Sequence, residues 1–180
     1  MFVSSAAGSV GTMAGQIARL KGAGRVIGSA GSRAKAAWLV EELGFDHAFD
    51  YHEGPVAERL RSAAPGGLDV YFDNVGGEQL AAAIEVARQG ARIALCGALA
   101  GAAPGGIDTL SLIGKRITLR GFTARDHPEV LRQGREEIGG WLREGRLTVP
   151  VTRVAGLRAA PRALLELLAG RHTGTVIVDL

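Results

Sequence analysis

The first thirty residues of the chain constrain its fold more than any other segment. Two strand-like apolar runs, residues 1–4 and 25–30, flank a turn of small residues (5–11) and an amphipathic stretch. The turn contains Gly8 and Gly11, which lack a Cβ, so its backbone can approach a ligand and the helix can pack closely on the strand. A strand, a glycine-containing turn, a helix and a second strand are typical of the first half of a dinucleotide-binding fold.

The turn itself is predicted to be a nucleotide site. The helix that follows it would present free N–H groups and the positive end of its dipole to a pyrophosphate. The first glycine of the G-x-G-x-x-G pattern is replaced by Ala6. The alternative is a glycine-rich turn in an α/β domain that binds no nucleotide.

The segment after the second run is basic. It reads Gly31-Ser32-Arg33-Ala34-Lys35, and no Asp or Glu occurs before Glu41. Sites that prefer NAD carry an acid about 20 residues after the turn, which binds the ribose 2′-hydroxyl. Here Arg33 and Lys35 would attract a 2′-phosphate and Ser32 could hydrogen-bond it, so NADP(H) is the predicted cofactor. Alternatively, both cations lie on a solvated helix face. The missing acid also disfavours a methyltransferase.

Further along the chain, apolar runs alternate with helical patterns, which predicts an α/β fold with a Rossmann-type, doubly wound parallel sheet. The predicted strands are 1–4, 25–30, 47–49, 68–73, 91–96 and 117–123, and the predicted helices are 10–21, 33–43, 55–63, 77–88 and 129–144. After residue 145 the alternation gives way to a short strand-helix-strand tail (147–154, 161–168, 175–178). We therefore predict a dinucleotide-binding domain over 1–145 and a C-terminal segment over 146–180.

Composition disfavours several other classes. Cys96 is the only cysteine, so no internal disulfide or cysteine-based metal site can form, and no metal site is predicted. No apolar stretch approaches the roughly 20 residues of a membrane span. A formal charge of +3 with 5% aromatic residues does not indicate nucleic-acid binding. No signal-peptide pattern begins at Met1, so we expect a cytoplasmic protein. The Tyr-x-x-x-Lys of short-chain dehydrogenases and the G-x-x-x-x-G-K-[ST] phosphate loop are both absent.

Several motifs carry a resemblance to one known family. In chain order they are Ala6-Ala7-Gly8-Ser9-Val10-Gly11, Gly31-Ser32 with Lys35, Gly44-Phe45-Asp46, Tyr51, Tyr71-Phe72-Asp73-Asn74-Val75-Gly76-Gly77 and Cys96-Gly97-Ala98. The chain resembles the zinc-independent medium-chain dehydrogenase/reductases of the prostaglandin reductase and alkenal double-bond reductase group, from residue 2 to residue 180. The block from Asp73 to Gly77 is the most specific part of this resemblance.

The resemblance implies a set of cofactor-binding residues. Those at the pyrophosphate would be Gly8, Ser9, Val10 and Gly11. Those near the 2′-phosphate would be Gly31, Ser32, Lys35 and Tyr51. Those at the ribose and nicotinamide would be Asn74, Cys96, Gly97, Ala98, Phe122, Thr123 and Ala124. His172, also expected at the cofactor, stands where the family usually has Asn. No catalytic residue is assigned.

The resemblance also implies an activity: an oxidoreductase that reduces the C=C bond of α,β-unsaturated aldehydes or ketones with NADPH. The family has an additional N-terminal substrate domain, and two of its tyrosines are replaced here at Ala102 and Gly114. We therefore expect the chain to be the cofactor-binding portion, inactive alone, with the substrate half supplied by another domain or chain. The resemblance further implies a homodimer that pairs through the edge strand 117–123. The alternatives are a non-catalytic NADPH-binding module and a quinone reductase.

Overall fold

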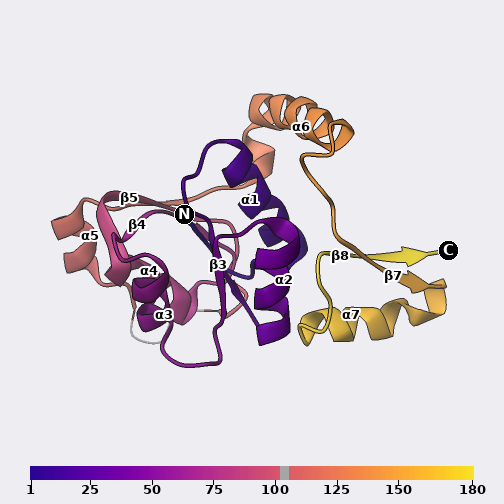
Figure 1. Ribbon diagram of the computed structural model, residues 1–180, viewed down its shortest axis with the longest axis horizontal. Coiled ribbons are helices and arrows are strands. Elements are labelled where there is room, and N and C mark those ends of the chain that lie inside the picture. Colours follow the sequence, from indigo (N-terminus) through magenta and orange to yellow (C-terminus); the bar gives the residue numbers. More distant parts are fainter. Residues whose placement is uncertain (102–105) are drawn as a thin grey trace.

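A computed structural model describes residues 1–101 and 106–180, and its central feature is a six-stranded parallel sheet (Figure 1). The strand order is β3-β2-β1-β4-β5-β6. From β1 the chain adds strands first toward one edge of the sheet and then, from β4 on, toward the other edge, as in a doubly wound fold. The strands are β1 (Phe2–Val3), β2 (Ile27–Ala30), β3 (His47–Asp50), β4 (Leu68–Asp73), β5 (Ala87–Leu95) and β6 (Thr118–Gly121). The predicted fold class is confirmed.

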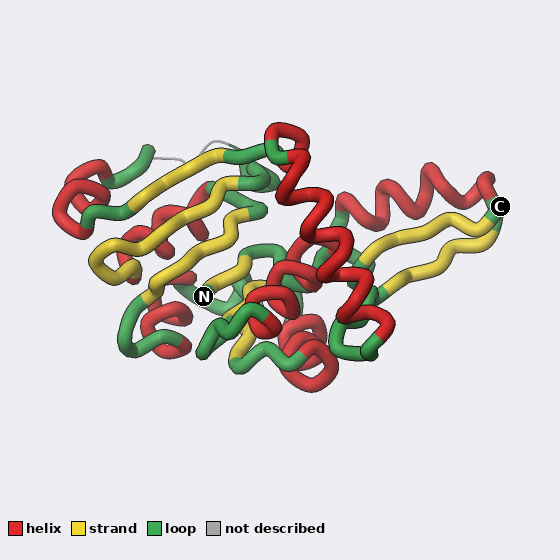
Figure 2. The backbone as a smooth tube through the Cα atoms, turned by 90° about the horizontal axis from the view of Figure 1, so that it is seen from above, coloured by secondary structure: helices red, strands yellow, loops and turns green. Residues whose placement is uncertain are grey.

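Helices cover both faces of this sheet, as Figure 2 shows from above. The helices are α1 (Ser9–Leu20), α2 (Arg33–Leu43), α3 (Val56–Ala63), α4 (Gly77–Val86), α5 (Thr109–Lys115) and α6 (Pro128–Arg143). The two residues of β1 point to opposite faces, because side chains alternate along a strand. Phe2 stacks on Tyr71 with ring centroids 4.7 Å apart, in the core beneath α3 and α4. Val3 packs with Leu39 and Phe45 in the second core, beneath α1 and α2.

Two elements differ from the sequence expectation. The predicted helix 77–88 ends at Val86, and residues 87–90 instead open strand β5, which is longer than the predicted 91–96. Helix α5 was not predicted at all. It begins at the N-cap Asp108, whose carboxylate accepts hydrogen bonds from the Ser111 backbone N–H at 3.1 Å and the Ser111 hydroxyl at 2.6 Å. Seven residues with exposed Leu110 and Ile113 leave too little apolar periodicity to indicate a helix.

The C-terminal tail forms a second, two-stranded parallel sheet that lies apart from the main one (orange and yellow in Figure 1). It consists of β7 (Val151–Ala155), α7 (Ala160–Leu168) and β8 (Thr175–Asp179), which confirms the predicted strand-helix-strand pattern. The tail is joined to α1 by Gln16, whose side chain donates to the Thr148 carbonyl and accepts from the Thr148 N–H, both at 3.0 Å. The domain boundary at 145/146 stays a prediction.

The part of the chain that the structure describes also contains two short 3₁₀ turns, at Ala124–Asp126 and Leu157–Ala159. Across residues 1–101 and 106–180, no helix has the length and apolar character needed to cross a membrane.

Candidate cofactor site

The predicted site residues follow the carboxyl ends of the six parallel strands. Residues 8–11 follow β1, 31–35 follow β2, Tyr51 follows β3, Asn74 follows β4 and 96–98 follow β5. The group Phe122, Thr123 and Ala124 follows β6. Since parallel strands end at one edge of the sheet, the fold gathers these groups at the crevice where open α/β sheets bind ligands. His172 is the exception, because it comes from the tail.

The turn after β1 is closely packed around Gly11. A Cβ on Gly11 would overlap the carbonyl oxygen of Ser5 and lie 2.6 Å from the Cα of Ala6, so no side chain fits there. Gly8 has slightly more room, with a hypothetical Cβ 3.3 Å from the Ser5 oxygen. Ser5 itself adopts a positive φ of 49°, which is uncommon for a residue other than glycine. Gly11 therefore allows helix α1 to start directly against the turn.

The start of helix α1 is open to a ligand. Its N-cap, Gly8, provides no side-chain cap, and the first turn carries no acidic residue. The unpaired N–H groups of a helix start and the positive end of its dipole favour an anion. Ser9 and Val10 are exposed on this turn, and the Ser9 hydroxyl lies 2.6 Å from that of Thr175. The turn thus fits a pyrophosphate.

At the end of β2, helix α2 starts with Ser32 as its N-cap. The Ser32 hydroxyl accepts from the Lys35 backbone N–H at 3.3 Å. The Lys35 ammonium donates to the backbone carbonyls of Gly170 at 2.5 Å and His172 at 2.6 Å. Desolvation by these surroundings lowers the pKa of Lys35 below its ordinary value. An ammonium has three N–H groups, so one remains for an anion.

The structure places the other predicted 2′-phosphate residues around the same strand end. The Tyr51 hydroxyl lies 3.5 Å from the position that a Cβ on Gly31 would occupy, so Gly31 and Tyr51 are neighbours. Arg33 lies to the outside: its side chain is 83% exposed and forms an ion pair with Glu53. That pairing makes Arg33 a weaker candidate for the phosphate than Lys35.

Asn74 and Cys96 are held together at the ends of β4 and β5. The Asn74 amide donates to the Ser4 carbonyl at 2.7 Å and accepts from the Cys96 thiol at 3.1 Å. Burial, followed by the nearby charge of Asp73, raises the pKa of Cys96 to about 11, so the thiol is neutral at physiological pH. A Cβ on Gly97 would lie 2.5 Å from the Asn74 carbonyl oxygen, which explains the glycine.

Asp73 is a buried hub beneath these residues that the sequence analysis did not assign to the site. Its side chain is fully buried, and its Oδ1 accepts from the Ser4 hydroxyl at 3.1 Å, from the Tyr71 hydroxyl at 2.6 Å, and from the N–H groups of Val75 and Gly76, both at 2.8 Å. Burial and the charge of Asp73 raise the pKa of Tyr71, so its phenol keeps the proton that it donates. The signal available in the sequence was an acid ending a buried strand, followed by Asn74 and two glycines.

The residues after β6 are less enclosed. Phe122 donates its backbone N–H to the Leu95 carbonyl at 3.2 Å, and its ring lies 6.2 Å from that of Phe72. Thr123 and Ala124 are exposed at the start of the first 3₁₀ turn. These residues reach the same edge of the sheet as Cys96, because β6 pairs with β5.

The tail contributes directly to this edge through residues 170–175. Of these residues, only His172 was predicted from the sequence to lie at the cofactor. Gly174 donates its N–H to the Ala7 carbonyl at 2.8 Å and forms a β-bridge with Gly8. The His172 ring is 14% exposed, and its Nε2 lies 3.5 Å from the Glu166 carboxylate. The segment therefore contacts both the turn and Lys35.

At the two positions where the resembling family has tyrosines, this chain has Ala102 and Gly114. Ala102 lies outside the described residues. Gly114 lies in α5, and a Cβ built on it would have no neighbouring atom within 4 Å. In the described part of the chain, no group of three or more His, Cys, Asp or Glu side chains could hold a metal ion.

Comparison with known proteins places this geometry in context. A family model described as zinc-binding dehydrogenase matches residues 9–138. The chain is 37% identical over 188 residues to the NADPH-dependent curcumin reductase of Escherichia coli (strain K12), with 99% of the chain and 54% of the relative covered. It is 40% identical over 185 residues to prostaglandin reductase 1 of Mus musculus, with 99% of the chain and 56% of the relative covered.

Among solved structures, CurA from Vibrio vulnificus in complex with NADPH matches with a TM-score of 0.89 and 36% identity. The match covers 99% of the chain and 56% of that protein. The chain thus spans about half the length of the curated relatives that it matches.

Proposed function

This chain belongs to the medium-chain dehydrogenase/reductase family, in the prostaglandin reductase group, and from that premise we propose that it is the NADPH-binding portion of an oxidoreductase. Its reaction is the reduction of the C=C bond of α,β-unsaturated aldehydes or ketones by hydride transfer. The observation that carries the proposal is the pair formed by the uncapped start of α1 and the Lys35 ammonium, both on one sheet edge.

The residues fit both charged groups of NADPH, the pyrophosphate and the 2′-phosphate. The start of α1 offers backbone N–H groups to the pyrophosphate, and Gly11 keeps the helix close to the turn. Lys35 is held by two tail carbonyls with one N–H left for the 2′-phosphate, beside Ser32 and Tyr51. No acid occupies the first turn of α2, where it would repel that phosphate.

When bound, the cofactor supplies a hydride, and this chain's residues hold the nicotinamide end in place. Asn74, fixed by Ser4 and Cys96, would contact the ribose, and Gly97 and Ala98 would line the nicotinamide. An enone is an electrophile that reacts with thiolates. Because Cys96 has a pKa of about 11, its thiol stays protonated and can line such a site without adding to the substrate.

The proposal extends to the parts that the chain does not itself contain. The wall of the cleft that holds the substrate comes from another domain or chain, so these 180 residues alone are expected to be catalytically inert. The apolar side of the tail, with Leu164, Leu165 and Leu168 exposed, is the surface proposed to face that half. We also propose a cytoplasmic location and a homodimer that pairs through the free edge of β6.

The test is NADPH consumption with matched enones, quinones and alcohols, using the chain together with its substrate half and, in parallel, the chain alone. Reduction of enones by the complete protein and none by the chain alone is the expected result. Faster turnover of quinones would favour a quinone reductase, and activity only on alcohols would refute the assignment. NADPH binding without turnover of any substrate would support a non-catalytic module.

A further inference from the structure

The segment that follows β3, residues 51–53, lies beside the end of β2. The Tyr51 N–H donates to the Ala30 carbonyl at 3.1 Å, which fixes the start of this segment. The next residue, His52, reaches the same place as the Tyr51 hydroxyl. The Cε1 atom of its ring lies 3.7 Å from the position that a Cβ on Gly31 would occupy. His52 therefore borders the place proposed for the 2′-phosphate.

The ring of His52 is oriented by Asp50. The Asp50 Oδ1 accepts from the His52 backbone N–H at 3.0 Å, and the ring Nδ1 lies 3.0 Å from the same oxygen. The ring also packs on that of Tyr51, with centroids 4.1 Å apart. Because a carboxylate only accepts hydrogen bonds, Nδ1 carries the proton of this contact. Among the residues that the structure describes, Nε2 has no hydrogen-bond partner, so it is available to a ligand.

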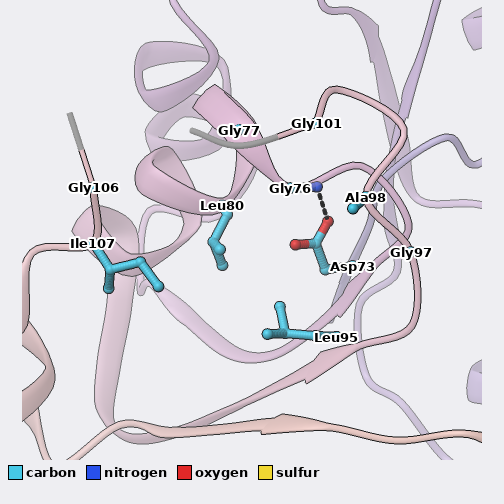
Figure 3. A pocket seen from close by; sticks show the side chains of 10 residues that line it. All are labelled: Asp73, Gly76, Gly77, Leu80, Leu95, Gly97, Ala98, Gly101, Gly106 and Ile107. Carbon is cyan, nitrogen blue, oxygen red and sulfur yellow. Dashed lines mark hydrogen bonds between the residues drawn. The ribbon is translucent and has the colours of Figure 1, made fainter. Parts of the chain in front are cut away.

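The ring is also accessible. The side chain of Asp73 at the end of β4 is enclosed (Figure 3), whereas that of His52 at the end of β3 is 62% exposed. A ligand can therefore reach His52 from solvent.

The charged and titratable groups around His52 leave it open to an anion. In its own segment, Asp50 is engaged by the ring, and Tyr51 is uncharged at neutral pH. Glu53 forms an ion pair with Arg33 of α2, so it is not free to repel a phosphate. Lys35 lies on the first turn of the same helix and adds a positive charge.

We propose that His52 is a second cationic contact of the cofactor's 2′-phosphate, beside Lys35, and that Asp50 positions its ring. With Nδ1–H directed at Asp50, Nε2 can donate to a phosphate oxygen only in the imidazolium form, in which both nitrogens carry a proton. A carboxylate on one side and a phosphate on the other both favour that form. His52 then favours NADPH over NADH only where the imidazolium is populated. This inference rests on the proposed function, because it adds a residue to the proposed NADPH site.

The experiment is a titration of NADPH and NADH into the chain and into His52→Ala, at pH 6.5 and at pH 8.5. At pH 6.5 the variant should bind NADPH about tenfold more weakly and NADH equally well, because a hydrogen bond between charged groups is lost. At pH 8.5, where an imidazole is ordinarily neutral, the two proteins should bind NADPH nearly equally. Both proteins contain Lys35 and His172 and meet the same phosphate, so the titration of those groups cancels in the comparison.

Two matched variants control this result. His52→Arg carries a charge that does not titrate in this range, so it should restore NADPH binding at both pH values. His47→Ala makes the same change as H52A at the amino end of β3, away from the site, and should leave both cofactors unaffected.

The role of Asp50 is tested through His52. In Asp50→Asn the amide oxygen can still accept both hydrogen bonds, but the negative charge is lost. This variant should weaken NADPH binding at pH 6.5 in the unaltered background and have no effect in H52A. The same loss in both backgrounds would refute the positioning role.

A loss in H52A that is equal at both pH values, or equal for NADPH and NADH, would overturn the proposal, because it would make His52 structural. NADPH binding that H52A leaves unchanged at pH 6.5 would refute this inference alone. Absence of NADPH binding by the unaltered chain would refute the proposed function together with it.

Discussion

Replacing Lys35 with alanine separates two roles of its ammonium, the observed contact with the tail and the proposed contact with the cofactor. Lys35 donates to the carbonyls of Gly170 and His172, and its remaining N–H is proposed to bind the 2′-phosphate of NADPH. NADH lacks that phosphate. Lys35→Ala should therefore weaken NADPH binding and leave NADH binding nearly unchanged.

The size of each effect follows from the contacts. A hydrogen bond to a charged group contributes about 1.5–3 kcal/mol, so the lost phosphate contact should lower NADPH affinity by about 10- to 100-fold. The two tail carbonyls are neutral acceptors near the surface, and desolvation of the ammonium, which lowers its pKa, offsets part of their contribution. The free energy of unfolding should therefore fall by only about 1 kcal/mol.

The assay is a fluorescence or calorimetric titration of both cofactors into the unaltered chain and the variant. Lys21→Ala is the matched control, since it removes the same charge from an exposed ion pair with Glu137, away from the site. The reasoning fails if NADPH and NADH bind equally well to the unaltered chain. It also fails if Lys35→Ala weakens both cofactors by the same factor, because that would make the residue structural.

Three further predictions concern the turn, the thiol and the sheet edge. Gly11→Ala should abolish NADPH binding and destabilise the fold by about 1–3 kcal/mol, because its Cβ would overlap Ser5, whereas Gly24→Ala, with open space around it, should bind normally in the same titration. Cys96 has a folded pKa near 11 against an ordinary 9, so its contribution to stability is present below about pH 9 and is lost as pH rises toward 11. Its alkylation rate should accordingly rise near pH 11, and an inflection near 9 would contradict this. Leu119→Pro removes a backbone donor from β6 and should convert a dimer to monomers in light scattering, and larger species that survive the substitution would point to association through the tail instead.

The main sheet was predictable because its strands are short apolar runs separated by helical patterns of ordinary length. Phe2 and Val3 illustrate this: both are apolar, and both are buried, on opposite faces. Helix α5 was not predictable from periodicity, because its stability comes from the Asp108 cap and from Leu112 packed against the core. Local capping by one aspartate leaves a weak signal in a seven-residue segment.

For the candidate site, the sequence predicted which strand ends would carry its residues, but not the backbone groups that hold them. The turn is recognisable in the sequence by its glycines, which lack side chains, and Lys35 by its charged side chain. The partners of Lys35 are backbone carbonyls 135 and 137 positions away, and a carbonyl has no residue type to identify it. The same holds for Asp73, whose role depends on four donors converging on one oxygen.

These tail contacts bear on how cofactor binding and assembly are coupled. The boundary predicted at 145/146 follows a change in topology, but hydrogen bonds cross it at Gln16, at Ala7 and at Lys35. A phosphate bound to Lys35 would favour the protonated ammonium against the desolvation that lowers its pKa, and so would help to keep its hydrogen bonds to the Gly170 and His172 carbonyls and to order the tail. Since the exposed side of that tail is the proposed contact for the substrate half, NADPH binding should favour assembly of the complete enzyme, and by linkage assembly should tighten NADPH binding by the same factor.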